Sequence, residues 1–239
     1  MNKLKNRKNN SVFRKFSKEE NDVWRILSTR RLKSLQGLAS QLHSAGWKKL
    51  GLSTSRIPDF YELNKKLGEL TGWQVTSTGV QYEEDHAWIS SLAEKKIRVT
   101  EYIRGKDSLD YTPLPDVFHD AFGHLPYLAI PQYARIAHKF GLAYIQAKTK
   151  KDKLKIANNW WYGIEFSFLR EGGKLKALGT GLVSSEGELK NALSDKVERL
   201  PYDSEVVGKI DRSAHEFHTK LFILDSLDQL EKIVNKWLK

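Results

Sequence analysis

Two histidines five residues apart are the first side chains in this sequence whose type and spacing suggest chemistry. His119 and His124 lie within PDVFHDAFGHLP, residues 115–126. Imidazoles are common metal ligands, but residues five apart on a straight α-helix point about 140° away from each other. A zinc-protease helix instead spaces its histidines four apart. We therefore predict a short helix that begins after Asp116 and ends near Gly123, before the closing proline, so that His124 turns back toward His119.

A carboxylate on a separate helix is the third candidate ligand. The periodicity of residues 152–170 predicts a helix whose apolar face contains Trp161 and Phe168, and Glu165 lies on that same side. An ionised carboxylate that faces a core is unfavourable unless it is paired or bound to a metal. Two histidines and one carboxylate form the ligand set of non-haem Fe(II) oxygenases. Alternatively, the histidines are hydrogen-bonded structural residues, and Glu165 reaches solvent or a basic side chain.

Two other motifs are weaker candidates for binding sites. His215 and His218 in HEFH are three apart, which also suits a metal pair, but no glycine or proline frames them. Residues 179–181, GTG, lack the later glycine that opens the helix of a phosphate-binding loop. A simple turn is therefore the expected structure at these glycines.

Composition excludes several classes of protein. Without cysteine, the chain has no disulfide, no thiolate-ligated haem, no iron–sulfur cluster and no cysteine-bound zinc. No apolar run approaches the roughly 20 residues that span a bilayer. The basic start is not followed by the apolar segment of a secretory signal. These features predict a cytoplasmic protein that does not enter membranes.

The net charge of +11 makes nucleic acid a partner to consider. Seven lysines and arginines lie within the first 18 residues, and the other basic residues are interleaved with acidic ones. The chain has no zinc-finger, RRM or KH motif. We therefore do not expect nucleic acid as the main partner, and a basic nucleic-acid-binding protein remains only a remote alternative.

The hydrophobic pattern predicts mostly helices. A capping box of Ser17 and Glu20 precedes a long amphipathic helix that continues to residue 43. The other predicted elements are helices over 58–72, 83–93, 131–147 and 152–170, a strand over 96–104, a turn at 171–174, an extended segment over 175–183, and a final helix after a second capping box at Ser226 and Gln229.

These elements predict a mainly α fold with a few short antiparallel strands. We find no internal repeat and no boundary in composition after the basic start. The sequence therefore predicts a flexible basic arm over residues 1–16, followed by a single catalytic domain over residues 17–239.

Three stretches resemble a known family when they are read together. TPLPDVFHDAFGHLP at 112–126, WWYGIEF at 160–166 and KALGTGLVSSEGEL at 176–189 are similar to the pterin-dependent aromatic amino acid hydroxylases, especially to their bacterial, phenylalanine-hydroxylating branch. Weaker similarity runs from about residue 17 to 237. The resemblance implies the catalytic-domain fold of that family, which is mainly helical with a small sheet.

The resemblance also implies a reaction. It implies Fe(II) held by His119, His124 and Glu165, with tetrahydrobiopterin or a related tetrahydropterin as co-substrate and O2 as oxidant. The implied activity is a monooxygenase that converts L-phenylalanine to L-tyrosine, and a tryptophan hydroxylase of the same family is the alternative. A zinc hydrolase is disfavoured by the spacing of the histidines and by the lack of a placed general base.

Individual residues match the family's motifs. The resemblance assigns the amino acid substrate to Arg104, Thr112, Trp161, Phe166 and Ser184. It assigns the pterin to Trp88, Asp120 and Trp160. Asp116 and Ser185 are expected to support these residues from behind the site.

The sequence departs from the family pattern at three positions. Leu114 stands where many members have glutamate, Trp160 where a tyrosine is common, and Trp88 where a phenylalanine is usual. These changes leave the three ligands intact and bear on how the pterin lies. The chain also has no room for the regulatory domain and tetramerisation arm of animal members, which predicts a monomer.

Overall fold

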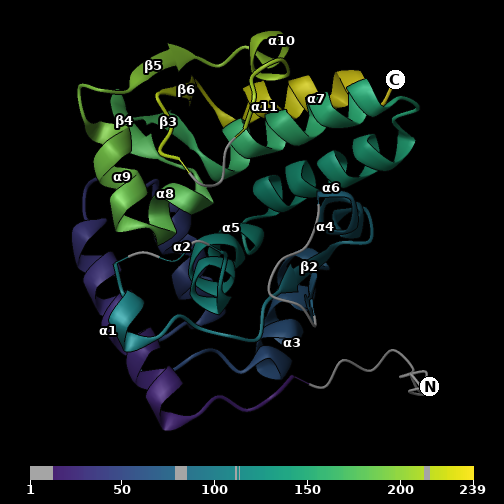
Figure 1. Cartoon of the computed structure of the whole chain (residues 1–239). Coiled ribbons are helices and arrows are strands. Elements are labelled where there is room, and N and C mark those ends of the chain that lie inside the picture. Colours follow the sequence, from purple (N-terminus) through teal and green to yellow (C-terminus); the bar gives the residue numbers. More distant parts are fainter. Residues whose placement is uncertain (1–12, 79–84, 111, 113, 213–215) are drawn as a thin grey trace, which may run out of the picture.

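The computed structural model describes residues 13–78, 85–110, 112, 114–212 and 216–239. Within these ranges the protein is mainly helical, with a four-stranded sheet on one side and a separate two-stranded pair elsewhere (Figure 1). The elements of the first half are α1 Lys18–Ser34, α2 Gln41–Leu50, α3 Phe60–Thr71, β1 Gln74–Ser77, α4 Asp85–Leu92, β2 Lys96–Val99, η1 Lys106–Ser108, η2 His119–His124, α5 Leu125–Leu128 and α6 Pro131–Gln146. Those of the second half are α7 Lys150–Trp160, η3 Trp161–Glu165, β3 Ser167–Glu171, β4 Lys174–Ala177, α8 Thr180–Ser184, α9 Glu186–Leu193, β5 Glu198–Pro201, α10 Ser204–Val207, β6 Lys220–Leu224 and α11 Leu227–Trp237. No helix of these described ranges is both long and apolar enough to span a membrane.

The mainly α fold class is confirmed, but the predicted strand direction is wrong for most pairs. Among the strands of the described residues only β3 and β4 pair antiparallel, across the turn that was predicted at residues 171–174. Strand β3 also pairs parallel with β6, β6 pairs parallel with β5, and β1 pairs parallel with β2. Helical crossovers explain the difference, because α4 separates β1 from β2 and α10 separates β5 from β6.

The long N-terminal helix that we predicted is two helices. Ser17 and Glu20 form the predicted capping box, but α1 ends at Ser34, and Gly37 adopts a left-handed φ of 74°. The next residues pair with the end of β4, where Ala177 donates to the Leu38 carbonyl at 2.8 Å and accepts from the Ser40 amide at 2.8 Å. This long-range pairing replaces helical hydrogen bonds that the sequence pattern alone favours.

The predicted helix over 152–170 is also wrong at its end. Helix α7 stops at Trp160, one π-helical turn follows as η3, and the chain then enters β3 at Ser167. Phe168, assigned by periodicity to the same helical face as Trp161, is therefore a buried strand residue. The apolar run suits either element, and pairing with β4 and β6 selects the strand.

The predicted strand over 96–104 is shorter in the structure. Strand β2 ends at Val99, after which side chains replace strand partners. The Thr100 amide donates to Asp120 at 2.7 Å, and the Arg104 amide donates to Asp116 at 2.9 Å. These carboxylates bend the segment into the wall of the site described below.

Three other predicted helices are confirmed, with small differences at their ends. Asp59 caps α3, and Gly72 ends it with a φ of 75°. Helix α6 begins at Pro131 as predicted. Ser226 caps α11, but the Gln229 side chain accepts from the Asp225 amide rather than completing the capping box. Side-chain caps mark the starts of α3 and α11, a proline marks the start of α6, and all three helices have a periodic apolar face.

The folded chain begins before Ser17. Residues 1–12 of the predicted arm lie outside the described residues. Phe13 is buried, with its ring centroid 4.8 Å from that of Phe60. Arg14 donates from Nε to the Glu101 carbonyl oxygen at 2.6 Å. The last part of the predicted arm is therefore packed against the domain.

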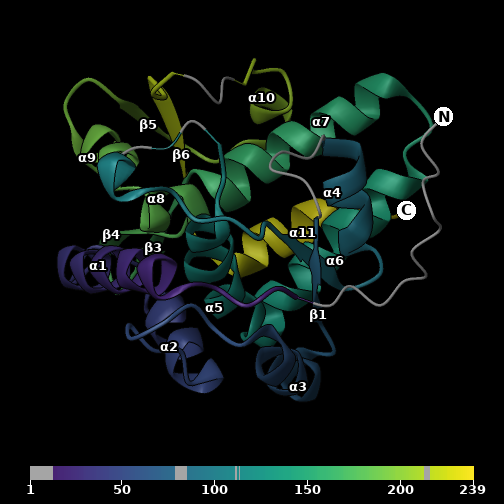
Figure 2. The same ribbon diagram turned by 60° about the horizontal axis from the view of Figure 1, so that its bottom comes forward.

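Helix α6 runs through the middle of the helical layer, where it contacts α4, α7 and α11. Figures 1 and 2 show the β3–β6 sheet at one end of α7, with α1, α2 and α3 on the far side of α5. The segments η2, η3 and α8 meet between these layers. Large rings fill the interior, among them Trp24, Trp73, Phe118, Phe122, Tyr127, Tyr133 and Phe140.

Helix α2 packs unusually close to α5 at Gly46. A Cβ atom there would lie 1.7 Å from the carbonyl oxygen of Pro126, a backbone atom that cannot move aside. We expect Gly46→Ala to lower the free energy of unfolding by about 3 kcal/mol, because the two helices must separate. Urea unfolding measures the effect. Gly105→Ala is the control, since nothing lies within 4 Å of its Cβ position, and equal stability of the two variants would contradict the prediction.

Candidate metal centre and active-site pocket

The segment that carries both histidines is a π-helix rather than a helix that stops. The predicted end at Gly123 is wrong, because η2 spans His119–His124 and continues directly into α5. Hydrogen bonds in a π-helix join residues five apart, so such residues lie on the same side. The two Nε2 atoms are 3.2 Å apart. In a π-helix, a spacing of five residues therefore places both histidines on the same side.

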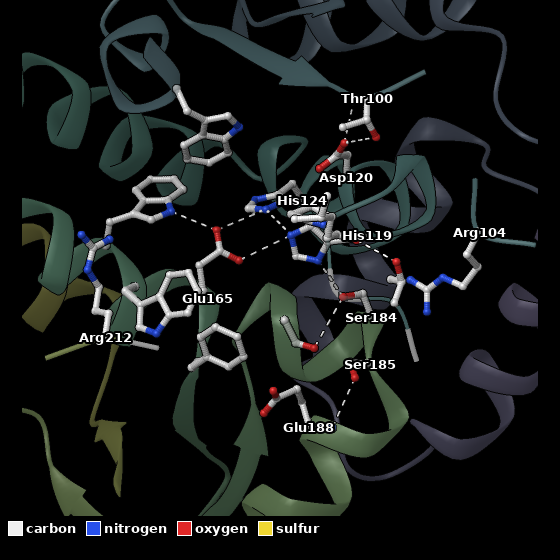
Figure 3. A pocket seen from close by; sticks show the side chains of 18 of the residues that line it. Thr100, Arg104, His119, Asp120, His124, Glu165, Ser184, Ser185, Glu188 and Arg212 are labelled. Atoms are coloured by element: carbon white, nitrogen blue, oxygen red, sulfur yellow. Dashed lines mark hydrogen bonds and ion pairs between the residues drawn. The ribbon is translucent and has the colours of Figure 1, made fainter. Parts of the chain in front are cut away.

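Glu165 completes a three-residue cluster with the two histidines (Figure 3). Its Oε1 atom lies 3.3 Å from His124 Nε2, and its Oε2 atom lies 3.7 Å from His119 Nε2. All three potential ligand atoms are within 4.8 Å of one another. Among the described residues this is the only such group of histidines and acidic residues. The structure thus brings together the three residues predicted as metal ligands.

Neighbouring side chains fix the orientation of the cluster. Ser184 Oγ lies 2.8 Å from His119 Nδ1, which directs the Nε2 atom toward the other two residues. Trp160 Nε1 donates to Glu165 Oε1 at 2.9 Å, again from five residues away in a segment that becomes π-helical. Thr180 Oγ1 donates to the other carboxylate oxygen. Each hydrogen bond restrains one candidate ligand.

The protonation states of Glu165 and His119 suit a divalent cation, while Glu165 outweighs burial and raises the pKa of His124. Burial opposes ionisation of Glu165, but His124 and then His119 and Thr180 outweigh it and hold the pKa of the carboxyl at about 2. Burial, reinforced by His124, lowers the pKa of His119 to about 4. An ionised carboxylate beside neutral imidazole is the form in which these side chains bind metal. The donor set therefore fits Fe(II).

A cavity of about 320 Å³ opens at this cluster. Tryptophan and phenylalanine rings form much of its wall, and the ring centroids of Trp161 and Phe166 are 4.9 Å apart. Every residue that the sequence assigned to the site lines this cavity except Asp116, which is fully buried behind it. The lining from that set is Trp88, Arg104, Thr112, His119, Asp120, His124, Trp160, Trp161, Glu165, Phe166, Ser184 and Ser185.

Arg104 is held at the edge of the cavity by Asp116. Its Nε and Nη2 atoms donate to the two carboxylate oxygens at 2.8 and 2.9 Å, in a two-bond pairing. Asp116 also accepts from the His119 amide at 3.1 Å and so caps the helix that carries the histidines. Asp116 uses two of the five guanidinium N–H groups. The others can serve a carboxylate in the cavity.

Trp88 and Asp120 also line the cavity, and Trp88 lies close to His124 and Trp160. The Trp88 ring centroid is 5.4 Å from His124 and 5.0 Å from Trp160. Asp120 accepts from both the amide and the hydroxyl of Thr100, and burial raises its pKa to about 7 although these hydrogen bonds oppose the rise. These flat and polar groups could face the two sides of a planar heterocycle.

The comparison with known proteins settles the family. Residues 5–239 match the family of biopterin-dependent aromatic amino acid hydroxylases. The chain belongs to this family. A phenylalanine-4-hydroxylase of Mesorhizobium japonicum is 35% identical over 217 residues, which cover 90% of this chain and 78% of that protein. The hydroxylase is thus an enzyme of the pterin-dependent iron monooxygenase class.

Solved structures agree with this membership. The apo phenylalanine hydroxylase of Colwellia psychrerythraea 34H has a TM-score of 0.88 at 30% identity, over 96% of this chain and 89% of that one. The phenylalanine hydroxylase of Chromobacterium violaceum, with bound iron(III) and 7,8-dihydrobiopterin, has a TM-score of 0.87 at 30% identity, over 92% and 81%. The predicted catalytic-domain fold is confirmed.

Sequence reasoning missed several residues of the hydroxylase site. Thr180 and Thr100 restrain Glu165 and Asp120, but a threonine carries no signal for such a role. His218, proposed as half of a weak metal pair, instead accepts from Trp161 Nε1 at 2.8 Å and supports the aromatic wall. Its predicted partner His215 lies outside the described residues. The glycines at 179–181 begin α8, which carries Ser184.

The hydroxylase also buries an arginine that we did not predict. Arg31 of α1 donates to the carbonyl oxygens of Val183 and Leu182, each at 3.0 Å, at the end of α8. The guanidinium is 3% exposed, and burial lowers its pKa to about 10. Cations are favourable at helix C-termini. This contact holds α8 in place and, with it, the neighbouring Ser184.

We expect Ser184→Ala to weaken metal binding about tenfold, because His119 loses the partner that orients its ring. Titration of metal-free protein with Co(II) measures this affinity. Ser185→Ala is the matched control. Its hydroxyl accepts from the Glu188 amide at 3.3 Å and caps α9, so its loss costs about 1 kcal/mol of stability and leaves metal affinity unchanged. Identical Co(II) affinities for both variants would refute the role of Ser184.

Proposed function

We propose that this protein is a phenylalanine 4-monooxygenase, which uses Fe(II), O2 and a tetrahydropterin to convert L-phenylalanine to L-tyrosine. The observation that carries the proposal is the cluster of His119, His124 and Glu165 at a cavity with aromatic walls and a fixed arginine. The relatives named phenylalanine-4-hydroxylase support this substrate over tryptophan.

In this proposal His119, His124 and Glu165 would hold the iron at the wall of the cavity. Bound Fe(II) and tetrahydrobiopterin, or a related tetrahydropterin, supply the electrons and the O2 activation that put one oxygen atom on the aromatic ring. Ser184 keeps His119 oriented, and Trp160 and Thr180 keep Glu165 oriented. Because the protein fixes these groups in advance, metal binding needs little rearrangement.

The amino acid lies between Arg104 and the aromatic wall in this proposal. The unused N–H groups of Arg104 bind its carboxylate, and Asp116 keeps the guanidinium from turning away. Thr112 lies at the same end of the substrate. Trp161 and Phe166 contact its ring and keep water from the reacting carbon.

The pterin is assigned to the side of the cavity formed by Trp88, Asp120 and Trp160. Asp116 acts from behind the cavity through Arg104, whereas Ser185 lines the cavity and caps the start of α9. Leu114 also lines the cavity, where it offers an apolar surface in place of a charged one. Together with the larger rings of Trp88 and Trp160, this surface favours a pterin position specific to this chain.

We further propose that the enzyme is a cytoplasmic monomer. The proposed location rests on the composition of the N-terminal segment described above, and the monomer is the oligomeric state expected in the sequence analysis. Sedimentation of the purified protein tests the oligomeric state, and a dimer would contradict it. Nucleic-acid binding and zinc hydrolysis have no support in the site and are not retained.

An activity assay tests the proposed reaction. We would load metal-free protein with Fe(II), add tetrahydrobiopterin, and follow hydroxylation of phenylalanine, tyrosine and tryptophan side by side. Phenylalanine is expected to have the highest kcat/KM, with no product when either iron or pterin is omitted. Higher kcat/KM for tryptophan would favour the alternative hydroxylase. No product from any of the three would overturn the proposal.

A further inference from the structure

The π-helical backbone of η2 needs a structural cause. Most sequences that can form a π-helical turn form an α-helix instead. Short π-helical turns are therefore rare, and many of them lie at functional sites. In an α-helix the Phe122 carbonyl would accept from the amide four residues later, but that residue is Pro126, which has no N–H. The carbonyl therefore cannot have its α-helical partner.

A histidine from another helix supplies a donor to this carbonyl. Nε2 of His43, in α2, lies 2.8 Å from the Phe122 oxygen. The ring is 2% exposed and is surrounded by Trp47, Phe122 and Tyr127, with centroids 6.4, 5.0 and 5.5 Å away. Because a carbonyl can only accept, Nε2 carries the proton in this contact. Burial also lowers the pKa of His43 to about 4, so the ring is neutral.

The position of His43 is fixed by the close packing of its helix. One turn later, Gly46 lets α2 approach the Pro126 carbonyl so closely that no side chain fits between them. The residues of α2 therefore hold both ends of the turn that links η2 to α5. The donor cannot drift from the Phe122 carbonyl unless this interface opens.

We propose that His43 is a positioning residue of the metal centre, which favours the π-helical form of residues 119–124 through its hydrogen bond to Phe122. In the α-helical form, His119 and His124 would point about 140° apart and could not bind one ion. Pro126 also favours the π-helical form, because in an α-helix the Phe122 carbonyl would find no N–H at residue 126. The inference rests on the proposed role of these histidines as ligands, and His43 itself touches neither metal nor substrate.

Metal affinity of a set of variants tests the inference. The probe is Co(II), titrated into metal-free full-length protein at a temperature well below unfolding. His43→Phe keeps the ring and removes the donor, and we expect Co(II) to bind about tenfold more weakly with an altered visible spectrum. His43→Gln places an amide N–H at a similar reach, and we expect affinity within about twofold of the wild type.

Thr71→Val is the matched control for a lost hydrogen bond. Thr71 Oγ1 donates to the Leu128 carbonyl at 2.9 Å, in α5 but beyond the π-helical turn. We expect this variant to lose stability comparable to His43→Phe while it keeps wild-type Co(II) affinity and spectrum. Equal weakening by both variants would show a general loosening of α5 and would overturn the inference.

Two further results decide the matter. Wild-type affinity and spectrum in His43→Phe would overturn the inference outright. If that variant does not fold, Pro126→Ala takes its place, because an alanine at 126 has the N–H that the α-helical form needs. We expect Pro126→Ala to bind Co(II) more weakly than the wild type. Undiminished Co(II) binding by this variant would refute the inference. A wild-type protein that binds Co(II) but hydroxylates no amino acid would contradict the proposed function and leave the role of His43 standing.

Discussion

The Glu165→Gln variant is expected to bind iron at least about 100-fold more weakly than the wild-type protein. An amide keeps the size of the side chain and can still accept from Trp160, but it carries no charge and is a poor metal ligand. The site would then offer only two neutral imidazoles. Burial lowers the pKa of His124 and Glu165 raises it above its ordinary value, so loss of the Glu165 charge favours the neutral imidazole in the variant.

Metal content and Co(II) titration measure this loss, and hydroxylation should fall in parallel. Glu188→Gln is the matched control, because Glu188 is a second carboxylate of the same cavity and is not part of the three-residue cluster. We expect this variant to keep wild-type metal affinity. Retention of iron by Glu165→Gln would show that the carboxylate is not a ligand.

The Arg104→Lys variant is expected to raise KM for phenylalanine about 100-fold while metal affinity stays unchanged. A single ammonium cannot replace a planar guanidinium that binds Asp116 with two atoms and presents further donors to the cavity. The buried, charged Asp116 would draw that ammonium to itself. The substrate carboxylate would then lack its partner, a loss typical of broken charge pairs.

Competition by phenethylamine, which has the ring of phenylalanine but no carboxylate, isolates this contact. We expect the wild type to bind phenylalanine far more tightly than phenethylamine, and Arg104→Lys to bind both with similar affinity. If the variant still prefers phenylalanine by the wild-type ratio, another group binds the carboxylate.

The sequence was sufficient to find the residues of the site but not the backbone that arranges them. His119, His124 and Glu165 were predicted from side-chain type, from an acidic group on an apolar face and from family motifs. The prediction of a helix that stops at Gly123 was wrong, because the periodicity of apolar side chains does not distinguish an α-helix from one π-helical turn. That choice depends on Pro126 and on His43, which is 76 residues away from His119 in the sequence.

The same distinction applies to the fold. Elements with their own caps and apolar faces, such as α3 and α11, were predictable from local sequence. Local sequence did not predict the end of α1 at Ser34 or the strand that begins at Ser167, since both depend on pairing with distant segments. Strand direction was missed for a similar reason, because it follows from how helices cross between the strands. The role of Arg31 could not be predicted from local sequence, because the carbonyl groups that it binds lie far along the chain, at the end of α8.

The two π-helical turns belong to separate stretches of the chain, so an ion bound between them acts as a cross-link. Ions that bind only the folded state stabilise it by an amount that grows with their concentration, about 2.7 kcal/mol at 100 times Kd. Metal-free and iron-loaded forms of this enzyme should therefore melt at different temperatures. Iron supply would then govern how long each molecule survives unfolding and proteolysis, as well as how fast it works.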